Sequence, residues 1–420
     1  MRYWRTTRGD GFFTYPSFSS PNGFTPAFQM ESGFPMNFPI EPFVSPTFDN
    51  GQTPSYADPK SGRPPIAQNW QLSIQRQLAK NLTMETAYVG TKGDHLITAN
   101  EILDQVDPKY LTLGSLLNAD INSSSAQAAG ITAPYPGFSG TVAQALRPFP
   151  QYQGISTNNV FCADKTGNST YHALQLKVQG KVRNDLTLSV AYTYSKNLND
   201  NSNVMSLANF TPSYYSAQNG YNRRAEKTYA AGDIPQNLVI GYVYDLPFGT
   251  GKAYLTRGVG SKIVGGWSLG GVLTYQSGVP IPSPYPAFSE VPLYAGQIRP
   301  NRVPGVPVLS DAARSGNFDP GTGPYLNVAA WSSPDPFNFG NAAGMSGARI
   351  PALLDEDVSI LKTTPLTEKL KLQFRAEAFN VANRTEFGFP NLSLGSSGFG
   401  TIASQQNRPR TIQFGLKLLF

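Results

Sequence analysis

Apolar and polar residues alternate along several segments of this chain, and the clearest case lies at the C-terminus. There, apolar residues stand at every second position, and only Leu419 breaks the alternation. These apolar residues are Ile412, Phe414, Leu416, Leu418 and Phe420. The same period recurs over 70–78, 82–90, 174–182, 186–195, 238–246, 267–276, 355–363 and 370–378. Because a period of two with one apolar face is typical of a half-buried strand, these segments predict an antiparallel sheet of about ten strands.

Two features of the predicted strands favour lipid, rather than a protein core, against their apolar face. The strands run over about 9 to 12 residues, longer than the usual ~5–6 and long enough for a tilted crossing of a bilayer. Aromatic residues stand near the strand ends, where membrane barrels carry interfacial girdles. These residues are Trp70, Tyr192, Tyr194, Tyr244, Trp267 and Tyr275. A soluble sandwich also buries one strand face, so the distinction depends on strand length and aromatic placement.

The connections between the predicted strands are mostly short and long in alternation. The short ones are 79–81, 183–185 and 364–369, with 247–266 longer and rich in Gly. The long ones are about 92–170, 197–235, 277–353 and 384–409. Outer-membrane barrels have short turns in the periplasm and long loops outside the cell. If the C-terminus lies in the periplasm, every short connection is periplasmic and every long one is extracellular.

This arrangement divides the chain into two regions. Residues 69–420 form the predicted portion of a transmembrane antiparallel β-barrel, and residues 1–68 precede its first strand on the extracellular side. Residues 1–68 are rich in Pro, Phe, Gly and Ser, so we expect an extended loop region with at most a short strand near 12–15. The one segment that could form a short helix is 119–129, inside a long loop.

The composition agrees with an all-β chain. Charged residues make up 14%, against about 25% in an average soluble domain, and the chain has 40 Gly, 35 Pro and 12% aromatic residues. The net charge is +6, but the basic residues are scattered along the chain, and only Arg223 and Arg224 form a tight pair. We therefore expect no nucleic-acid binding. No run approaches the roughly 18 apolar residues of a membrane helix. No apolar segment follows the basic residues 1–8, so no secretory signal peptide is expected.

Residues that could carry catalysis or bind a metal are few. Cys162 is the single cysteine, and His95 and His172 are the two histidines. This excludes an intrachain disulfide and disfavours zinc and His-based sites. Residues 249–252, Gly-Thr-Gly-Lys, lack the spacing of a phosphate-binding loop and predict a turn. We therefore expect no enzyme activity, no metal site and no cofactor.

Two groups of charged residues are candidates for ligand contact. Asp355, Glu356 and Asp357 could act as paired carboxylates or bind calcium, but a charged strand start at the extracellular rim is the favoured interpretation. Arg375 and Glu377 lie on one face of a predicted strand. They could contact a ligand in the barrel lumen or simply line a hydrated wall.

Several motifs resemble the end of the barrel in Oar-like TonB-dependent transporters, especially those of acidobacterial type. The resembling motifs are DEDVSILK (355–362), LQFRAEAFN (372–380), NRTEFG (383–388) and PRTIQFGLK (409–417). Upstream motifs are NWQLSIQR (69–76), YVG (88–90), DLPFG (245–249) and GGW (265–267). The resemblance covers about 69–420 and is densest after 355.

This resemblance implies the C-terminal part of a barrel of roughly 22 strands in the outer membrane of a Gram-negative bacterium. Family members import large nutrients such as glycans, peptides or metal chelates. TonB acts on these transporters through their plug domain. We expect this chain to lack the plug and the earlier strands, as a truncated, split or fragmentary product. Its expected partners are outer-membrane lipid, the barrel-assembly machinery and an unidentified nutrient ligand, with TonB acting only through the missing plug.

The C-terminal strand has a second expected role. Its alternating residues resemble the signal by which barrel-assembly machinery recognises its substrates; the alternative is an ordinary amphipathic strand that ends in Phe. The residues of this signal are Ile412, Phe414, Leu416, Leu418 and Phe420.

Two other functions stay open on the sequence. The chain could be a barrel remnant whose long loops bind or adhere at the cell surface without transport. It could also be a secreted soluble β-protein, such as a carbohydrate-active enzyme. Solute flux through vesicles tests the first alternative, and recovery without detergent tests the second.

Overall fold

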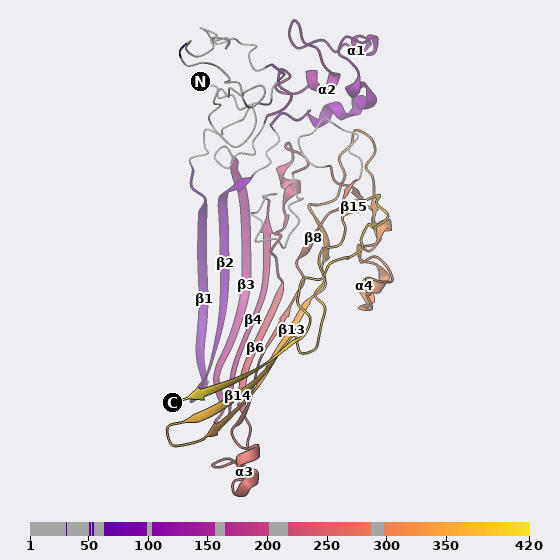
Figure 1. Ribbon diagram of the computed structural model, residues 1–420. Helices are drawn as coiled ribbons and strands as arrows, with labels where there is room; N and C mark the ends of the chain where they lie inside the picture. Colours follow the sequence, from indigo (N-terminus) through magenta and orange to yellow (C-terminus); the bar gives the residue numbers. More distant parts are fainter. Residues whose placement is uncertain are drawn as a thin grey trace.

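The computed structural model contains one large antiparallel sheet, which forms the long curved set of arrows in Figure 1. The structure describes residues 31, 50, 51, 53, 63–98, 103–155, 164–200, 217–286 and 298–420. In order across the sheet, the long strands are β1 (Ile66–Ala79), β2 (Leu82–Thr98), β3 (Asp164–Arg183), β4 (Leu186–Asn199), β6 (Gln236–Asp245), β7 (Trp267–Gln276), β13 (Leu353–Pro365), β14 (Lys371–Phe379) and β16 (Thr411–Leu419). A two-residue strand, β5 (Thr228–Tyr229), pairs with β4 and brings the sheet to ten strands. The predicted all-β class with about ten antiparallel strands is confirmed.

Each segment with a period of two forms one of these strands, and several strands continue beyond the predicted bounds. β2 extends to Thr98 and β3 begins at Asp164, because their backbones stay paired past the alternating residues. β1 begins at Ile66. Most of residues 1–68, including the short strand expected near 12–15, lie outside the described part of the chain.

Short and long connections lie at opposite ends of the sheet (Figure 1). We call the end of the sheet with the short connections the turn end and the end with the long connections the loop end. The turn end contains the C-terminus and the connections 80–81, 184–185, 246–266 and 366–370. The 246–266 connection contains α3 (Gly258–Val264), which extends beyond the sheet in Figure 1. β1 and β16 both run from the loop end to the turn end, so the two edge strands point in the same direction.

Neighbouring strands are staggered along the sheet. The row of paired residues that starts at Leu82, just after the first turn, ends at Ile412 in β16. Leu82 is the first residue of its strand at the turn end, whereas Ile412 lies eight residues before the C-terminal Phe420 (420 − 412). Over the seven steps from β2 to β16, the paired row therefore shifts by about one residue per strand relative to the turn end. At ~3.3 Å per residue and ~4.8 Å between strands, this stagger corresponds to a strand tilt of roughly 38°. Such a tilt is typical of β-barrels.

The pairing places apolar side chains on one face of the sheet and mostly polar ones on the other. One cross-strand row on the apolar face consists of Leu176, Tyr192, Leu238, Tyr275 and Leu354. The adjacent row on the opposite face consists of Gln175, Thr193, Asn237, Gln276 and Leu353. Within the described chain this apolar face is uncovered, since Leu72 is 69% and Phe414 is 74% exposed. An uncovered apolar face of this extent indicates an apolar surrounding or a large interface.

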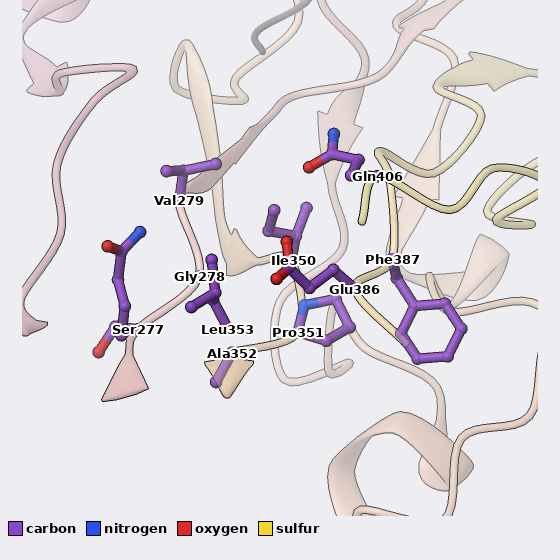
Figure 2. Close-up of a pocket in the computed structure, with 11 residues that line it drawn as sticks. Ser277, Gly278, Val279, Ile350, Pro351, Ala352, Leu353, Glu386, Phe387 and Gln406 are labelled. Atoms are coloured by element: carbon purple, nitrogen blue, oxygen red, sulfur yellow. The ribbon is translucent and has the colours of Figure 1, made fainter. Parts of the chain in front are cut away.

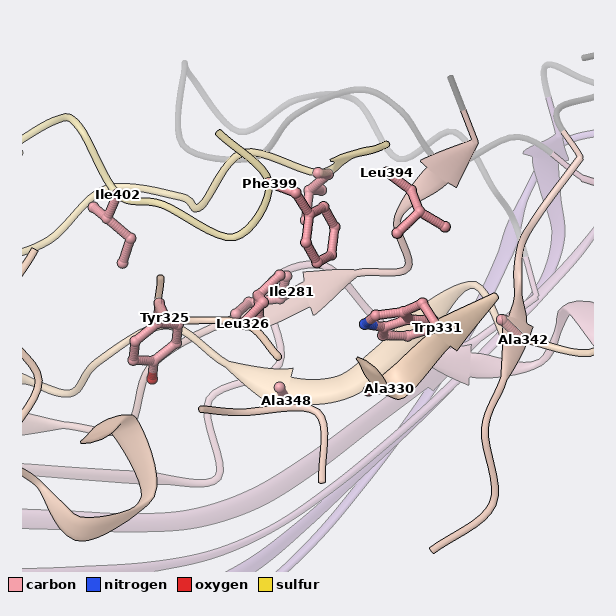
Figure 3. Close-up of a cluster of buried hydrophobic side chains, with 11 residues drawn as sticks. Ile281, Tyr325, Leu326, Ala330, Trp331, Ala342, Ala348, Leu394, Phe399 and Ile402 are labelled. Carbon is pink, nitrogen blue, oxygen red and sulfur yellow. The ribbon is translucent and has the colours of Figure 1, made fainter. Parts of the chain in front are cut away.

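The described parts of the long connections are folded, and two clusters of buried side chains hold them together. The first joins the β7–β13 and β14–β16 connections and includes Ile281, Trp331 and Phe399 (Figure 3). The second is centred on the β2–β3 connection and includes Leu117, packed with Ile298 from the β7–β13 connection. The largest buried clusters of the described chain therefore lie at the loop end and not within the sheet.

Short elements order these connections. The helices are α1 (Ser124–Ala128), α2 (Val142–Ala145) and α4 (Asp311–Ser315), with 3-10 segments over Pro108–Asn118, Arg223–Glu226 and Val328–Ala330. The short strands pair as β8 (Pro280–Pro282) with β12 (Met345–Arg349), β9 (Tyr285–Pro286) with β15 (Ser393–Leu394), and β10 (Asn301–Arg302) with β11 (Trp331–Ser332). α1 falls within 119–129, where the sequence permits a short helix. Within the described ranges, no helix has the length and apolar character needed to cross a bilayer.

Candidate functional site

A pocket lies at the base of the folded loops, where β7 ends and β13 begins (Figure 2). Its volume is about 200 Å³. Three segments line it: the end of β7 with the residues before β8, the residues that lead into β13, and the β14–β16 connection. The lining residues are Gln276, Ser277, Gly278, Val279, Ile350, Pro351, Ala352, Leu353, Glu386, Phe387 and Gln406.

Close backbone contacts join the first two of these segments and hold the third together, and Ile350 and Phe387 from the second and third pack against the same buried cluster. A Cβ on Gly278 would lie only 1.8 Å from the Ile350 carbonyl oxygen, so the two backbones can meet only with glycine at that position. The Ile350 amide donates a hydrogen bond to the Val279 carbonyl at 3.1 Å. The Gln406 amide donates to the Glu386 carbonyl at 2.9 Å, which holds the two arms of the β14–β16 connection side by side. The pocket is therefore built by main-chain contacts between segments far apart in sequence.

Glu386 is the one charged residue among those that line the pocket. Burial raises the pKa of the Glu386 carboxyl, and the nearby Asp355 carboxylate raises it further. Gln276, Ser277 and Gln406 supply additional donors and acceptors, and the other lining residues are apolar or Gly. Such a site can accept hydrogen bonds from an ammonium or hydroxyl group while it contacts an apolar surface.

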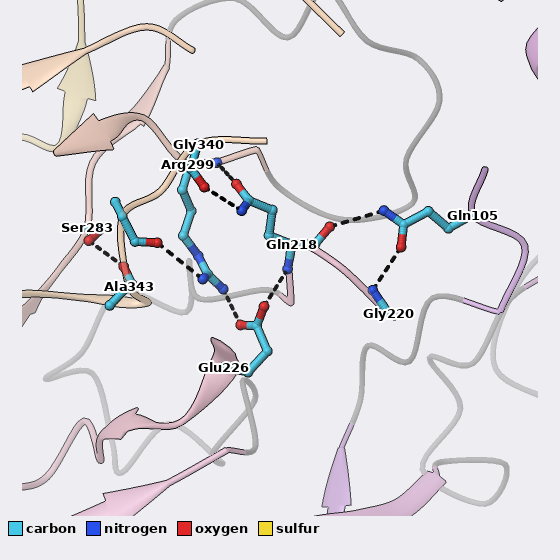
Figure 4. Close-up of polar contacts among 9 residues, drawn as sticks. Gln105, Gln218, Gly220, Glu226, Ser283, Arg299, Gly340 and Ala343 are labelled. Carbon is cyan, nitrogen blue, oxygen red and sulfur yellow. Dashed lines mark hydrogen bonds and ion pairs between the residues drawn. The ribbon is translucent and has the colours of Figure 1, made fainter. Parts of the chain in front are cut away.

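A buried polar network fixes three of the long connections relative to one another (Figure 4). Arg299 forms an ion pair with Glu226 of the β4–β6 connection, and their side chains are only 6% and 2% exposed. The Gln218 side chain accepts from the Arg299 amide at 2.7 Å and donates to the Gly340 carbonyl at 2.8 Å. Gln105, from the β2–β3 connection, donates to the Gln218 carbonyl at 3.4 Å. Because buried charges need partners, this network holds the loops in one arrangement.

Two further arginine–carboxylate pairs lie at the loop end. Arg349 forms an ion pair with Asp233, whose side chain is buried. The Arg349 guanidinium also lies 5.2 Å from the centre of the Tyr229 ring. Arg384 Nε lies 3.1 Å from each carboxylate oxygen of Glu356. The first pair joins the β4–β6 connection to β12, and the second joins β13 to the β14–β16 connection.

Two of the three acidic residues at the start of β13 have side-chain partners that hold the structure together. Glu356 belongs to the ion pair just described, and Asp357 accepts a hydrogen bond from the Asn380 amide at 2.9 Å. The Asp355 carboxylate is the group that, in addition to burial, raises the pKa of Glu386. The structure thus places this run at the loop-end start of a strand, which agrees with the favoured interpretation of the sequence.

Arg375 and Glu377 lie on the polar face of β14, as the alternation predicts. Arg375 Nη2 lies 2.7 Å from Glu377 Oε1, and Gln413 of β16 donates to the second Glu377 oxygen at 2.6 Å. Both residues stand in β14, whereas the pocket is formed by residues at the loop end. The structure therefore does not join them to the pocket, and contact with a ligand in the lumen stays a prediction.

The residues of the predicted assembly signal share the apolar face at the edge of the sheet. Phe414 stacks on Phe374 of β14, with 6.3 Å between the ring centres. The signal residues are strongly exposed: Ile412, Phe414, Leu416, Leu418 and Phe420. Recognition of this strand by the barrel-assembly machinery stays a prediction.

The remaining sequence candidates do not form a site in the described chain. His172 Nδ1 lies 2.8 Å from the Tyr88 hydroxyl, and Cys162 lies outside the described residues. Gly249 and Gly251 have φ angles of 103° and 78°, which agrees with the predicted turn. Over the described ranges, no group of three or more His, Cys, Asp or Glu side chains is arranged to hold a metal ion.

Sequence reasoning does not identify the residues that build the pocket and the loop network. Glu226 and Arg299 are 73 positions apart and belong to no periodic segment or motif. Glu386 lies within the NRTEFG motif, and that motif is the sequence signal that could have pointed to it.

A comparison with protein families matches the profile of the outer membrane beta barrel domain to residues 3–413 of this chain. The chain belongs to the outer membrane beta barrel domain family. Membership places the protein in the cell outer membrane, as the strand pattern predicts, and identifies the surroundings of the uncovered apolar face as lipid. Trp70 and Tyr194, which are 41% and 56% exposed on that face, agree with this environment.

This outer membrane beta barrel domain also resembles larger solved barrels. The outer membrane transporter YddB from Escherichia coli shares 10% identity at a TM-score of 0.38, over 88% of this chain and 34% of that one. BauA, the ferric preacinetobactin receptor from Acinetobacter baumannii, shares 11% identity at a TM-score of 0.37, over 88% of this chain and 32% of that one. The chain therefore spans about a third of the length of these proteins. A search of curated proteins finds no match.

Proposed function

We propose that this outer membrane beta barrel domain is the C-terminal part of the barrel of an Oar-like TonB-dependent transporter. The transporter takes up a large nutrient, such as a glycan, a peptide or a metal chelate. The long connections face the cell exterior and make the first contacts with the nutrient, and the C-terminus faces the periplasm.

The direction of the two edge strands is the observation that carries this proposal. β1 and β16 run in the same direction, so an antiparallel barrel cannot form by joining one to the other. An odd number of further strands must stand between them to give the even count of bacterial single-chain barrels. Within the described chain, no strand covers the outer side of β1 or β16. Unpaired strand edges are not stable in hydrocarbon, which supports a larger barrel.

The loop end supports ligand capture. The buried network around Arg299 and Glu226 holds three of the long connections in one arrangement, and a rigid surface loses less conformational entropy on binding than a mobile one. The pocket with Glu386 offers a carboxylate within an apolar setting. Arg375 and Glu377 lie on the face that would line the lumen, where a nutrient would pass after capture.

Uptake assays test the transport function. A strain without the gene should lose uptake of one nutrient class among labelled glycans, peptides and metal chelates, and a protonophore should abolish the same uptake in the parent strain. Glu386→Gln should lower uptake at limiting nutrient, with Glu368→Gln, on an exposed turn at the opposite end, as the control. Unchanged uptake of every class in the deletion strain would contradict transport and favour the surface-binding alternative.

The size of the mature protein tests the barrel-portion claim. Antibodies against 298–352 should detect in outer membranes either a polypeptide longer than 420 residues or this chain in a stable complex with a second one. Detection of this chain alone, folded and resistant to extraction, would contradict the claim.

A further inference from the structure

The connection between β6 and β7 lies at the turn end, where α3 extends beyond the sheet (Figure 1), and it carries exposed apolar side chains. Val259 and Ile263 stand four residues apart in α3 and are 75% and 64% exposed. Leu255, just before the helix, is 58% exposed. Because residues four apart share one face of a helix, α3 presents an apolar stripe. Single exposed apolar residues are common, but a stripe on a protruding helix indicates an interaction surface.

The same connection is basic. Residues 246–266 include Lys252, Arg257 and Lys262 and no acidic residue. Arg257 precedes the first residue of α3, and Lys262 lies beside Ile263 in its last turn. An apolar stripe flanked by cations is typical of a helix that lies in the headgroup layer of an anionic membrane.

Specific contacts attach α3 to the sheet. Trp267 Nε1 donates a hydrogen bond to the Ile263 carbonyl at 3.1 Å. The Lys362 ammonium donates to the carbonyls of Lys262 at 3.2 Å and Gly265 at 3.4 Å, and it lies 4.9 Å from the centre of the Trp267 ring. A cation at these carbonyls also stabilises the C-terminal end of the helix. The position of α3 is therefore fixed relative to β7 and β13.

The attachment point lies on the lipid-facing side of the sheet. Trp267, Lys362, Phe374 and Leu416 form one cross-strand row on the apolar face. Trp and Lys are typical of the membrane boundary, where the ring contacts lipid and the charge reaches the headgroups. The headgroup layer adds roughly 5–8 Å on each side of the hydrocarbon, and a short helix attached at this boundary fits within it.

We propose that α3 is an interfacial anchor that binds the anionic phospholipid leaflet at the turn end. Val259 and Ile263 insert among the upper acyl carbons, and Arg257 and Lys262 bind the lipid phosphates. In this arrangement the apolar surface of α3 extends the lipid-facing surface of the sheet. The proposal rests on the outer-membrane location of the chain and on the periplasmic orientation of the turn end proposed above, and not on transport.

Fluorescence quenching of the full chain in vesicles tests the anchor. In a Cys162→Ser background, Val259→Cys and Glu368→Cys each carry one environment-sensitive fluorophore; position 368 is an exposed turn position at the same end of the sheet. In vesicles of phosphatidylcholine and phosphatidylglycerol, a nitroxide near the lipid headgroups should quench the label at 259, and aqueous iodide should quench the label at 368. The label at 259 should lie about 5–10 Å inside the boundary. If a label at 259 prevents folding, Ile263→Cys carries the same test.

Charge neutralisation separates headgroup binding from apolar insertion. The double variant Arg257→Gln, Lys262→Gln should weaken docking of α3 by roughly 30-fold in vesicles with phosphatidylglycerol, at about 1 kcal/mol for each cation. In vesicles of phosphatidylcholine alone the same variant should change docking little.

Three outcomes would overturn the proposal. Equal iodide quenching at 259 and 368 would show that α3 stays in water. A label at 259 that is shielded from iodide but not reached by the lipid nitroxide would show that protein, and not lipid, covers the stripe. Docking that is the same with and without phosphatidylglycerol would exclude binding to anionic headgroups.

Discussion

Trp70 of β1 lies directly opposite Gly90 of β2, and its indole ring occupies the space that a side chain on Gly90 would need. A Cβ on Gly90 would lie 2.2 Å from Trp70 Cε2. The indole also meets the His172 ring edge-on, with 6.1 Å between the ring centres. The glycine thus lets an aromatic residue lie flat along the first hairpin, close to the loop end.

Gly90→Ala should displace the Trp70 indole and destabilise the first hairpin by about 1–3 kcal/mol through overpacking. Urea unfolding measures the change in the free energy of unfolding. In a Trp70→Ala background the same substitution should cost much less, because the obstructing ring is gone. Gly241→Ala is the matched control, since its Cβ would meet nothing closer than the Ser189 carbonyl oxygen at 3.9 Å. Equal effects at 90 and 241 would contradict this account.

Glu226→Gln should release the long connections while the sheet remains folded. The change replaces one charge of a buried ion pair by a neutral amide, and loss of one charge from such a pair typically costs about 3–5 kcal/mol. Limited proteolysis should then cut within 217–235 and 298–352 at protease concentrations that leave the parent protein intact. Asp311→Asn, which removes the exposed pair with Arg314, should have an effect below about 1 kcal/mol. If both variants resist proteolysis like the parent, the network does not hold the loops.

Tyr325 should make the loop cluster sensitive to alkaline pH. Burial raises the pKa of Tyr325 to about 12, from about 10 in an unfolded chain. Between these two pH values the Tyr325 phenol stays neutral in the folded protein and is ionised in the unfolded chain. The contribution of Tyr325 to the free energy of unfolding is therefore fully present below pH ~10. It decreases by about 2–3 kcal/mol as the pH rises towards ~12. Ultraviolet absorbance of phenolate and near-ultraviolet circular dichroism follow the transition together.

Tyr325→Phe should remove that alkaline loss, although it also removes the hydrogen bond from the Tyr325 hydroxyl to the Arg349 carbonyl at 2.8 Å. The variant is therefore compared with itself at pH 8 and pH 11. Tyr254→Phe, at an exposed position, should keep the alkaline transition of the parent. An unchanged transition in Tyr325→Phe would assign it to another group.

Deletion of Phe420 should reduce assembly of the barrel in cells. Phe420 is fully exposed at the end of the alternating apolar residues, where it has little to contribute to packing within this chain. The measurement is the fraction of heat-modifiable, folded protein in the outer membrane. Lys417→Ala, on the polar face of the same strand, should assemble like the parent. Normal assembly without Phe420 would contradict a role of this residue as a recognition signal.

Much of the sheet can be predicted from sequence because side chains alternate on a strand whatever its partners are. The positions of Ile412 and Leu416 on one face, and of Arg375 and Glu377 on the other, follow from this period alone. The turn at 80–81 and the order of short and long connections follow equally well. The bounds of β2 and β3 at the loop end could not be predicted. The last residues of β2 and the first residues of β3 are held by pairing with each other, and they do not continue the apolar alternation.

The loop end could not be predicted, because its contacts join segments that are far apart and have no period. The ion pair of Arg299 and Glu226, the approach of Gly278 to the Ile350 carbonyl and the position of Glu386 each depend on how whole connections fold against one another. Composition indicated only that these regions are rich in turns.

By itself, the sequence determined the strands, their two faces, their alternating connections and the outer-membrane class, since these depend on local alternation and on which solvent suits each face. Only the tertiary structure decided the stagger of the strands, the position of β1 and β16 at the two edges of one sheet, the folded loops and the attachment of α3 at Trp267 and Lys362. These features are contacts between distant residues, and their free energy depends on the positions of both partners in space and on neither residue alone.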